Sequence, residues 1–358
     1  MRRWDPWLLL SVMAISAASY LAQSSTAQAL DRPGFAFRQL AWLVVGFALM
    51  VLVGTLDYRV LARFWPLFYT ASVLVLIATL VLAPVRAGTR SWLVIGAFTV
   101  QPSEFARVVV ILTLAAVASV HQEALLAPRK ALELFGLTAL PMGLVLLQPD
   151  LGVALTFLPA LFAVFWLGGL RTRVWALLGT AAAVLAVVAF FSLLKPYQKE
   201  RILTFLQPDR APLTAGYQQR QAKIAVGSGG FTGKGLKSGT QSQLRFLPAQ
   251  RTDFIFAVWA EETGFAGSAL LVFAYGLLLF RVFYTGLQAR DRLGLLLSGG
   301  VGAVMAAQVL VNIGMNLGIM PTTGITLPLL SYGGSSALAT GLALGLVQSV
   351  WRLRFANV

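Results

Sequence analysis

The stretch from residue 64 to residue 83 reads FWPLFYTASVLVLIATLVLA and contains no charged side chain. A hydrocarbon core about 30 Å thick is crossed by a helix of roughly 20 apolar residues, so this stretch is long enough to span a membrane. Comparable apolar runs occupy 7–23, 40–56, 104–120, 134–148, 151–168, 174–194, 255–284, 294–314 and 336–351. We therefore predict an all-α, polytopic integral membrane protein of about ten transmembrane helices.

The composition agrees with lipid as the main solvent. Hydrophobic residues make up 58% of the 358 positions and charged residues only 11%, too few for a water-soluble surface of this size. The absence of cysteine excludes a thiolate nucleophile and a disulfide. We assign the net charge of +15 to membrane orientation and contact with anionic membrane lipids, and expect no nucleic-acid partner.

Two segments near span boundaries need an interpretation. The first 29 residues combine a basic start, an apolar stretch and Ala27-Gln28-Ala29, as in a cleavable signal peptide, but we expect them to remain as the first span. The run 134–168 could form one long helix. We divide it at Gln148-Pro149-Asp150, because proline stops a helix and an unpaired carboxylate avoids lipid.

The distribution of basic residues predicts the orientation. With the N-terminus inside, thirteen Lys or Arg residues fall in cytoplasmic segments and four in the short outer segments. By the positive-inside rule, both termini are cytoplasmic. Residues 195–253 then form a large extracytoplasmic loop between helices 7 and 8, with ten basic and three acidic residues and a net charge of +7. Such a charge calls for an anionic partner.

Two parts of this loop allow alternative interpretations. Residues 195–206 mix basic and apolar side chains at near-helical spacing, which fits either a helix in the headgroup layer or the frayed end of the seventh span. Residues 227–235, GSGGFTGKG, fail the Walker pattern. Their glycines could let backbone N–H groups approach an anion, with Lys234 beside them, or they could form a flexible loop.

The carboxylates indicate where chemistry could occur. Glu104, Asp150 and Asp253 each stand where a span meets the outer surface, so three helices offer an acid at one depth. Each alone could simply stabilise a helix N-terminus by about 0.3–1 kcal/mol. Together, beside a basic loop, they indicate a site. Of Glu261 and Glu262, two turns deeper, at least one is expected to pair with a basic residue.

The remaining eight acids have simpler interpretations, and three of them, Asp31, Glu200 and Asp209, fall in outer loops with no special setting. Asp5, Asp57, Glu123, Glu133 and Asp291 fall at inner edges, where we expect them to balance nearby arginines.

Several motifs in one order resemble the SEDS family of shape, elongation, division and sporulation proteins. They are Trp92 with Gln101-Pro102-Ser103-Glu104-Phe105-Ala106, Gln148-Pro149-Asp150-Leu151-Gly152, Gly227-Ser228-Gly229-Gly230 with Gly233-Lys234-Gly235, Gly239-Thr240-Gln241-Ser242 with Phe246-Leu247-Pro248, Thr252-Asp253-Phe254-Ile255-Phe256-Ala257 with Glu261-Glu262, Asn312-Ile313-Gly314, and Pro328-Leu329-Leu330-Ser331-Tyr332-Gly333-Gly334-Ser335-Ser336. The resemblance covers nearly the whole chain and implies one membrane domain over 1–358.

The resemblance also implies an activity. Family members polymerise peptidoglycan glycan strands from lipid II in the bacterial cytoplasmic membrane, together with a class B penicillin-binding protein that is a transpeptidase. Asp253 matches the essential aspartate of the family. The short termini resemble the elongation branch, RodA, more than the division branch, FtsW, although Thr326-Leu327-Pro328 would also suit FtsW.

The chain departs from the family pattern at two places. It has Pro248-Ala249-Gln250-Arg251 where Pro-Glu-x-His is usual, so no role of that Glu or His carries over. It has Arg107 where Lys is common. Both arginines keep a positive charge that suits a phosphate.

The activity that the resemblance implies, taken with the residues present, predicts a mechanism with a single catalytic carboxylate acting as the base. A hydroxyl of the acceptor attacks the anomeric carbon of the donor, and with no outer histidine or cysteine the base must be a carboxylate, for which we choose Asp253. Pyrophosphate leaves without a general acid if positive charge stabilises it, and the displacement inverts the donor.

Several groups are candidates for that stabilisation and for substrate binding. The predicted substrate-binding residues are Arg251, Lys234, Glu104, Arg107, Asp150 and Ser331. A divalent cation, Mg or Mn, could also neutralise the pyrophosphate, with Glu104 as its candidate ligand.

Two other functions stay open at this point. A flippase for lipid-linked precursors would show ionisable residues at mid-membrane and an internal repeat of broken helices. A non-catalytic scaffold for the penicillin-binding protein would leave Asp253 dispensable.

Overall fold

The computed structural model describes residues 4–85, 88–96, 98–120, 128–170, 174–176, 179–180, 199 and 215–355. The long helices are α1 (Pro6–Ala29), α2 (Gly34–Thr55), α4 (Trp65–Leu82), α5 (Pro102–Val120), α6 (Pro128–Leu147), α13 (Ile255–Leu287), α14 (Arg292–Leu317) and α15 (Gly334–Leu353). Shorter helices are α3 (Tyr58–Arg63), α7 (Leu151–Leu155), α8 (Leu158–Leu167), α11 (Ala215–Ser228) and α12 (Thr240–Gln243). Two strands, β1 (Leu93–Ile95) and β2 (Phe98–Val100), complete the described elements.

The predicted class, a polytopic helical membrane protein, is confirmed. Within the described part of the chain, seven helices are long and apolar enough to cross a membrane: α1, α2, α4, α5, α6, α13 and α14. Helices α7 and α8 together cover the predicted run 151–168, and α15 covers the run 336–351. The predicted span 174–194 and the predicted headgroup helix 195–206 lie almost entirely outside the described residues.

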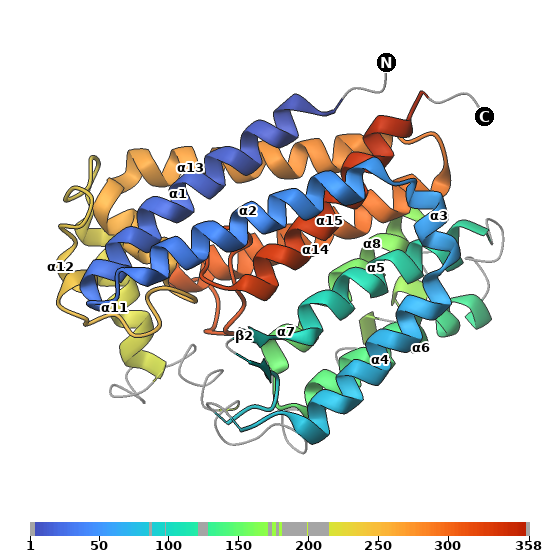
Figure 1. Cartoon of the computed structure of the whole chain (residues 1–358), viewed down its shortest axis with the longest axis horizontal. Helices are drawn as coiled ribbons and strands as arrows, with labels where there is room; N and C mark the ends of the chain where they lie inside the picture. The colour runs from blue at the N-terminus through green and yellow to red at the C-terminus, as the bar shows by residue number, and fades with distance from the viewer. Residues whose placement is uncertain are drawn as a thin grey trace.

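The helices form one bundle with both chain ends on the same side (Figure 1). Helices α1, α2, α13, α14 and α15 run alongside one another, and α4, α5, α6 and α8 pack next to them. We call the side with both termini the terminal end. The opposite side, which carries α11, α12 and residues 229–254, is called the loop end.

Buried polar contacts hold the terminal end together. Asp5 caps α1 by accepting the N–H groups of residues 7 and 8, and its carboxylate pairs with Arg281 of α13 at 2.8 Å. Asp291 pairs with Arg59 at 2.8 Å and accepts the hydroxyl of Tyr58 at 2.7 Å. Burial, and then the hydrogen bond to Asp291, raises the pKa of Tyr58 above its usual value. The predicted pairing of Asp5 and Asp291 with arginines is confirmed.

Helices α2 and α15 cross unusually closely because both carry glycine at the contact. A Cβ added at Gly341 would lie 2.1 Å from the carbonyl oxygen of Gly46, and one at Gly46 would lie 2.7 Å from that of Ala337. Small residues allow such backbone contact in membranes, where the hydrophobic effect does not drive helices together.

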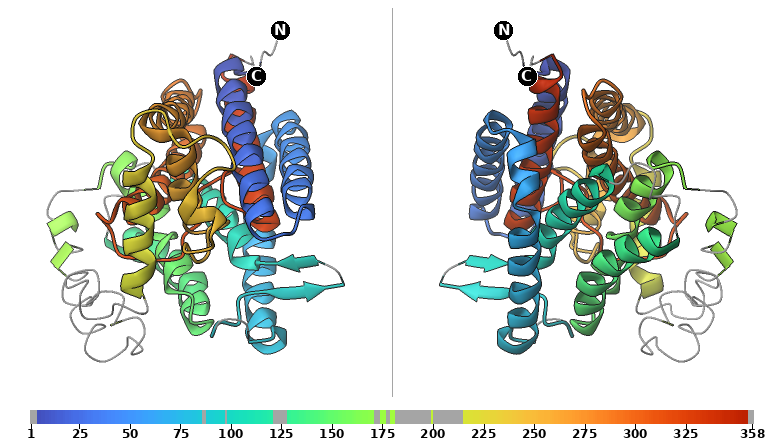
Figure 2. Two further views of the ribbon diagram at one scale, coloured as in Figure 1. Left: turned by 90° about the vertical axis from the view of Figure 1, so that its left-hand side faces the viewer. Right: turned by 90° about the vertical axis from the view of Figure 1, so that its right-hand side faces the viewer.

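The boundary between α6 and α7 and a short β hairpin bear on the sequence predictions. The predicted division at Gln148-Pro149-Asp150 is confirmed, because α6 ends at Leu147 and the Asp150 carboxylate caps α7 at the Val153 N–H. The antiparallel hairpin of β1 and β2, paired from Leu93 with Val100, was not predicted. It projects sideways from the bundle (Figure 2).

Candidate active site

A tight turn at residues 249–254 leads the chain into α13. Ala249 has φ +48°, in the left-handed region. Its carbonyl oxygen accepts the N–H groups of Thr252, Asp253 and Phe254 at 3.1, 3.2 and 3.3 Å. This 249–254 turn places Asp253 two residues before Ile255, the first residue of the buried first turn of α13, at the loop end.

Other parts of the protein hold the carbonyl groups of this turn. The carbonyl oxygen of Arg251 accepts hydrogen bonds from Gln23 Nε2 of α1 at 3.0 Å and from the Tyr332 N–H at 2.8 Å. The next carbonyl oxygen, of Thr252, accepts the Ser331 hydroxyl at 2.6 Å. The turn is therefore fixed from two directions, by α1 and by the segment before α15.

The third carbonyl in succession belongs to Asp253. It accepts hydrogen bonds from Asn312 Nδ2 at 3.2 Å and Asn316 Nδ2 at 3.0 Å, both on α14. The Asp253 residue is half-buried. Its Oδ2 would lie 3.8 Å from a Cβ added at Gly324, so the carboxylate faces the segment that joins α14 to α15.

The start of α7, which Asp150 caps, packs against the same segment. A Cβ at Gly152 would lie 2.2 Å from the carbonyl oxygen of Thr323, so the start of α7 packs directly against residue 323. Asp150 accepts the Val153 N–H at 3.2 Å and Gln101 Nε2 at 3.2 Å. The first turn of α7 and the Asp253 carboxylate thus both lie against residues 323–324, while a shared role of Asp150 and Asp253 stays a prediction.

Ser331, a predicted substrate-binding residue, lies beneath the turn. It is buried, and its hydroxyl oxygen accepts the Leu327 N–H at 2.9 Å while donating to Thr252. These contacts give Ser331 a supporting position, and direct substrate contact by it stays a prediction.

The Arg251 side chain lies over two aromatic rings. Its guanidinium carbon is 4.5 Å from the ring centre of Phe35 and 5.2 Å from that of Tyr332. The two rings meet edge to face at 5.5 Å. Stacking on aromatic faces orients a guanidinium while its N–H edge can still donate hydrogen bonds, which suits recognition of a phosphate.

The Lys234 ammonium group, which was predicted to contact the substrate, makes its hydrogen bonds within the protein. It donates to Ser228 Oγ at 2.7 Å, Thr240 Oγ1 at 2.8 Å and Glu261 Oε1 at 2.8 Å. An ammonium has three protons, so these contacts use all of them. The expectation that a buried glutamate pairs with a basic residue is confirmed for Glu261.

The glycine-rich segment 230–235 bridges a break in α13. Gly264 has φ +66°, ψ −162°, and the helix is interrupted there. The Lys234 and Gly235 N–H groups donate to the carbonyls of Glu261 and Glu262, and the carbonyls of residues 230 and 231 accept the N–H groups of residues 265 and 266. Two backbone N–H groups that we considered for an anion are thus used within the fold.

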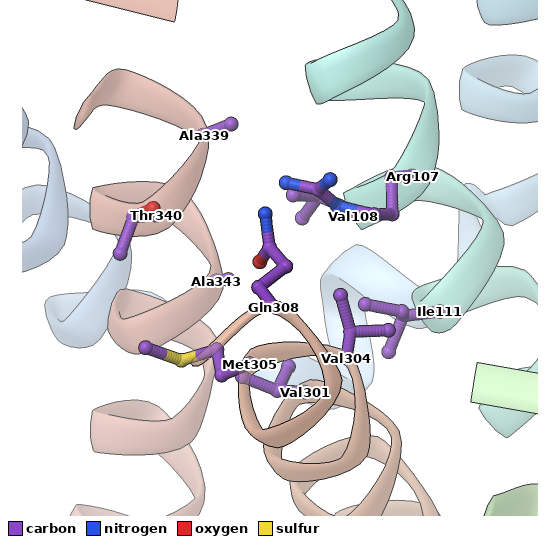
Figure 3. A pocket seen from close by; sticks show the side chains of 10 residues that line it. All are labelled: Arg107, Val108, Ile111, Val301, Val304, Met305, Gln308, Ala339, Thr340 and Ala343. Carbon is purple, nitrogen blue, oxygen red and sulfur yellow. The ribbon is translucent and has the colours of Figure 1, made fainter. Parts of the chain in front are cut away.

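Glu104 and Arg107 form a buried ion pair on α5. Their side chains are 3% and 5% exposed, and the guanidinium also donates to Thr156 Oγ1 at 3.2 Å. When the Gln308 amide is rotated by 180° from the orientation drawn in Figure 3, its oxygen accepts from both terminal nitrogens of Arg107 at 3.2 and 3.3 Å. A small cavity of about 20 Å³ lies beside this group, and Thr340 lines its far side (Figure 3).

One face of α14 connects the two groups of polar residues. Gln308, Asn312 and Asn316 follow at intervals of four residues, so they share a helix face at steps of about 6 Å. Gln308 contacts Arg107, while the two asparagines contact Asp253. The predicted site residues Arg107 and Asp253 are therefore linked through α14.

The metal prediction gains no support from this geometry. Among the described residues, no three His, Cys, Asp or Glu side chains come close enough to hold a metal ion. The Glu104 carboxylate is already paired with Arg107. A divalent cation at Glu104 stays a prediction, and we derive no step through it.

The buried amides that hold the turn had no role assigned to them from the sequence, although Asn312 stands in one of the motifs quoted above. Gln23, Asn312 and Asn316 are each 0% exposed within apolar helices. Gln39 of α2 belongs with them, because it donates to the Ser331 carbonyl and accepts the Gly333 N–H. A search for polar residues of any kind inside the spans, and not for acids alone, would have found all four.

These features define a class: a polytopic helical membrane protein with a polar site at one end of its bundle. A model of the FtsW, RodA and SpoVE family, described as cell cycle proteins, matches residues 3–354. The chain belongs to this family.

Individual relatives agree with this assignment. The peptidoglycan glycosyltransferase MrdB of Escherichia coli is 37% identical over 97% of this chain and 93% of its own length. A probable peptidoglycan glycosyltransferase FtsW of Thiomicrospira cyclica is 34% identical over 98% and 92%. Among solved structures, a chain of a peptidoglycan synthase complex that coordinates polymerization and crosslinking matches with a TM-score of 0.87 and 37% identity, covering 99% of both chains.

Proposed function

We propose that this protein is a peptidoglycan glycosyltransferase that polymerises glycan strands from lipid II, with Asp253 as the general base. The curated relatives with this activity in their names match nearly the whole chain. MrdB, which groups with RodA in the elongation branch, has a higher identity to this chain than the FtsW relative, 37% against 34%. The observation that carries the catalytic part is the 249–254 turn, whose three successive carbonyls are held by α1, α14 and residues 331–332.

The chemistry requires one proton acceptor and one stabilised leaving group. The acceptor hydroxyl oxygen forms a bond to the anomeric carbon of the donor, and its proton passes to the Asp253 carboxylate. The bond from that carbon to the pyrophosphate breaks, and its electron pair leaves with the pyrophosphate. A single displacement of this kind converts an α-linked donor into a β-linked product.

Arg251 is the side chain best placed to contact the leaving pyrophosphate. It lies two residues from Asp253 in the same turn, and its guanidinium is oriented by Phe35 and Tyr332. A fixed guanidinium stabilises developing negative charge without having to reorganise during the reaction. Lys234 is less suited to this task, because Glu261 already neutralises its charge.

Arg107 and Glu104 belong to a second, deeper part of the proposed substrate site. Their mutual pairing neutralises both charges. Thr156 and, in the rotated orientation of its amide, Gln308 accept further hydrogen bonds from the terminal nitrogens of Arg107. We propose that this pair, with Asp150, keeps α5 and α7 in place around the segment 323–324 that Asp253 faces.

The partner and the orientation follow from the same proposal. A class B penicillin-binding protein would cross-link the strands, as suggested by the similarity to a chain of a synthase complex. Lipid-linked substrate at the loop end requires that end to face outward, with both termini in the cytoplasm.

Polymerisation by the purified protein tests the function directly. The protein, alone and with its transpeptidase partner, is incubated with fluorescent lipid II, and glycan chains are separated by length. We expect glycan chains longer than one disaccharide unit to form only when this protein is present. Movement of lipid II across liposomes without any polymer would instead support the flippase alternative.

A further inference from the structure

Two asparagines of α14 contact the peptide group of Asp253 from inside the bundle. Asn316 Nδ2 donates to the Asp253 carbonyl at 3.0 Å and to the Asn312 carbonyl at 2.8 Å. Asn312 Nδ2 donates to the Asp253 carbonyl at 3.2 Å and to the Ile325 carbonyl at 2.7 Å. Both side chains are 0% exposed.

Asn316 also holds the first turn of α13. Its Oδ1 accepts the Ala257 N–H at 3.0 Å. The residue before this helix, Phe254, makes no side-chain capping bond. The Ala257 N–H, in the first turn, also donates to the Phe254 carbonyl at 3.1 Å, so Asn316 provides a second acceptor for it. The Asn316 amide thus connects Asp253, which precedes the start of α13, to Ala257, which follows it.

Asn312 connects the same carbonyl to the segment that the Asp253 carboxylate faces. Its second bond, to Ile325, fixes the chain one residue after Gly324, and a Cβ at Gly324 would lie 3.8 Å from Asp253 Oδ2. The two asparagines therefore set the position of Asp253 relative both to its own helix and to residues 323–325.

We propose that Asn316, assisted by Asn312, is a positioning residue that fixes the Asp253 carboxylate for proton abstraction. The inference rests on the proposed role of Asp253 as general base. Neither asparagine touches the reacting atoms in this account, because both act on the main chain of Asp253. Their amide groups serve as a rigid link from α14, one of the most buried spans, to the base.

A purely stabilising role predicts a different kinetic result. If the amides only join α13 to α14, their loss lowers the amount of folded protein, and each folded molecule works normally. If they position the base, kcat per folded molecule falls while KM for lipid II stays nearly constant, because an interaction important only in the transition state has been weakened.

The experiment compares three variants of the full chain with the transpeptidase partner. Asn316→Leu and Asn312→Leu replace the amides by side chains of similar size. Ser298→Ala is the matched control, since Ser298 is also buried on α14 but has no hydrogen-bond partner among the described residues. Folded protein is quantified by size-exclusion chromatography and thermal unfolding, and kcat and KM are measured for glycan polymerisation.

We expect kcat of Asn316→Leu to fall about 10- to 100-fold with KM within about threefold, the scale of loss that a displacement near 1 Å can cause. Asn312→Leu should lose less, because Asn316 still donates to the Asp253 carbonyl. Ser298→Ala should behave like the wild type. If Asn316→Leu does not fold, the same kcat and KM comparison is decided by Asn312→Leu.

The proposal is overturned if the folded asparagine variants keep kcat within about twofold of the Ser298→Ala control. It is also overturned if KM rises while kcat stays constant, since that pattern indicates substrate binding. Failure of the proposed function is distinguishable, because then the wild type makes no polymer or Asp253→Asn remains active, whatever the asparagine variants do.

Discussion

Glu261 and Asp253 lie close together in the sequence, yet the protein surrounds them in different ways. Glu261 is 0% exposed, and its carboxylate accepts hydrogen bonds from the Lys234 ammonium, the Thr240 hydroxyl and the N–H groups of Gln241 and Ser242. The contacts around Glu261 are therefore made by its side chain. The Glu261 carboxylate thereby joins residues 228–242 to the broken helix α13.

At Asp253 the protein holds the main chain instead. The carbonyls of residues 251–253 are all fixed, by Gln23, Ser331, Tyr332 and the two asparagines, and the half-buried carboxylate faces residue 324. The contrast shows how an ionisable residue in a membrane protein can be sorted. We interpret the carboxylate whose bonds join parts of the fold, Glu261, as structural, and we propose that the one whose backbone is held by the fold, Asp253, is presented for chemistry.

The largest effect on stability is expected at Glu261. Glu261→Ala leaves the Lys234 ammonium and two N–H groups without their acceptor, and removing one partner of a buried ion pair costs about 3–5 kcal/mol. Asp253→Asn should change the free energy of unfolding by no more than about 0.5 kcal/mol. Thermal unfolding in lipid nanodiscs, followed by tryptophan fluorescence, measures both. Equal unfolding midpoints for the two variants would remove the distinction between the regions.

Lys234 is expected to show a smaller effect of the same kind. Lys234→Met should lower stability by about 1–3 kcal/mol, because Glu261 loses a charged hydrogen-bond donor. The double variant with Glu261→Gln should lose less than the sum of the two single variants, since the residues are in contact. KM for lipid II should stay unchanged. A raised KM for lipid II together with an unchanged unfolding midpoint would show that Lys234 binds the substrate, as the sequence predicted.

Arg251 should affect substrate use more than stability. Arg251→Gln removes the stacking on Phe35 and Tyr332, worth about 0.5–1 kcal/mol at a partly exposed site, and the proposed pyrophosphate contact. We expect KM for lipid II to rise at least about 2- to 5-fold, with Arg251→Lys in between. Wild-type turnover by Arg251→Gln at limiting lipid II would show that this guanidinium does not contact the substrate.

The smallest effects are expected from single cysteine substitutions, which test the side of the membrane that the loop end, with Glu261 and Asp253, faces. Ser238→Cys at the loop end and Ala289→Cys at the terminal end introduce single thiols into a chain without cysteine, and neither should reduce activity. An impermeant thiol reagent added to intact cells should label Ser238→Cys and leave Ala289→Cys unlabelled until the membrane is opened. The opposite labelling pattern would reverse the predicted orientation.

The sequence predicted features that depend on local signals. The apolar runs located the long helices to within a few residues at most ends, and Pro149 with Asp150 located the division between α6 and α7. The sequence singled out Glu104, Asp150 and Asp253 because charge is scarce in an apolar chain and therefore conspicuous, and their roles stay predictions.

Features that depend on long-range contacts were not predictable in this way. Lys234 lies in a glycine-rich stretch typical of anion binding, and only the fold brings it to Glu261. Asn312 and Asn316 carry no charge, and their significance arises from the turn that packs against them. The hairpin of β1 and β2 has only three residues in each strand, too few for a period-two pattern to stand out.

The measurement that tests the central claim most directly is glycan polymerisation by purified Asp253→Asn protein. Asparagine preserves the size of the side chain but cannot take up the proton, and loss of general-base catalysis typically lowers the rate about 10²- to 10⁴-fold. We predict that loss in kcat, with an unchanged unfolding midpoint and retained binding of the transpeptidase partner. If Asp253→Asn elongates lipid II within a few-fold of the wild-type rate, Asp253 is not the base, and Glu104 becomes the next residue to test.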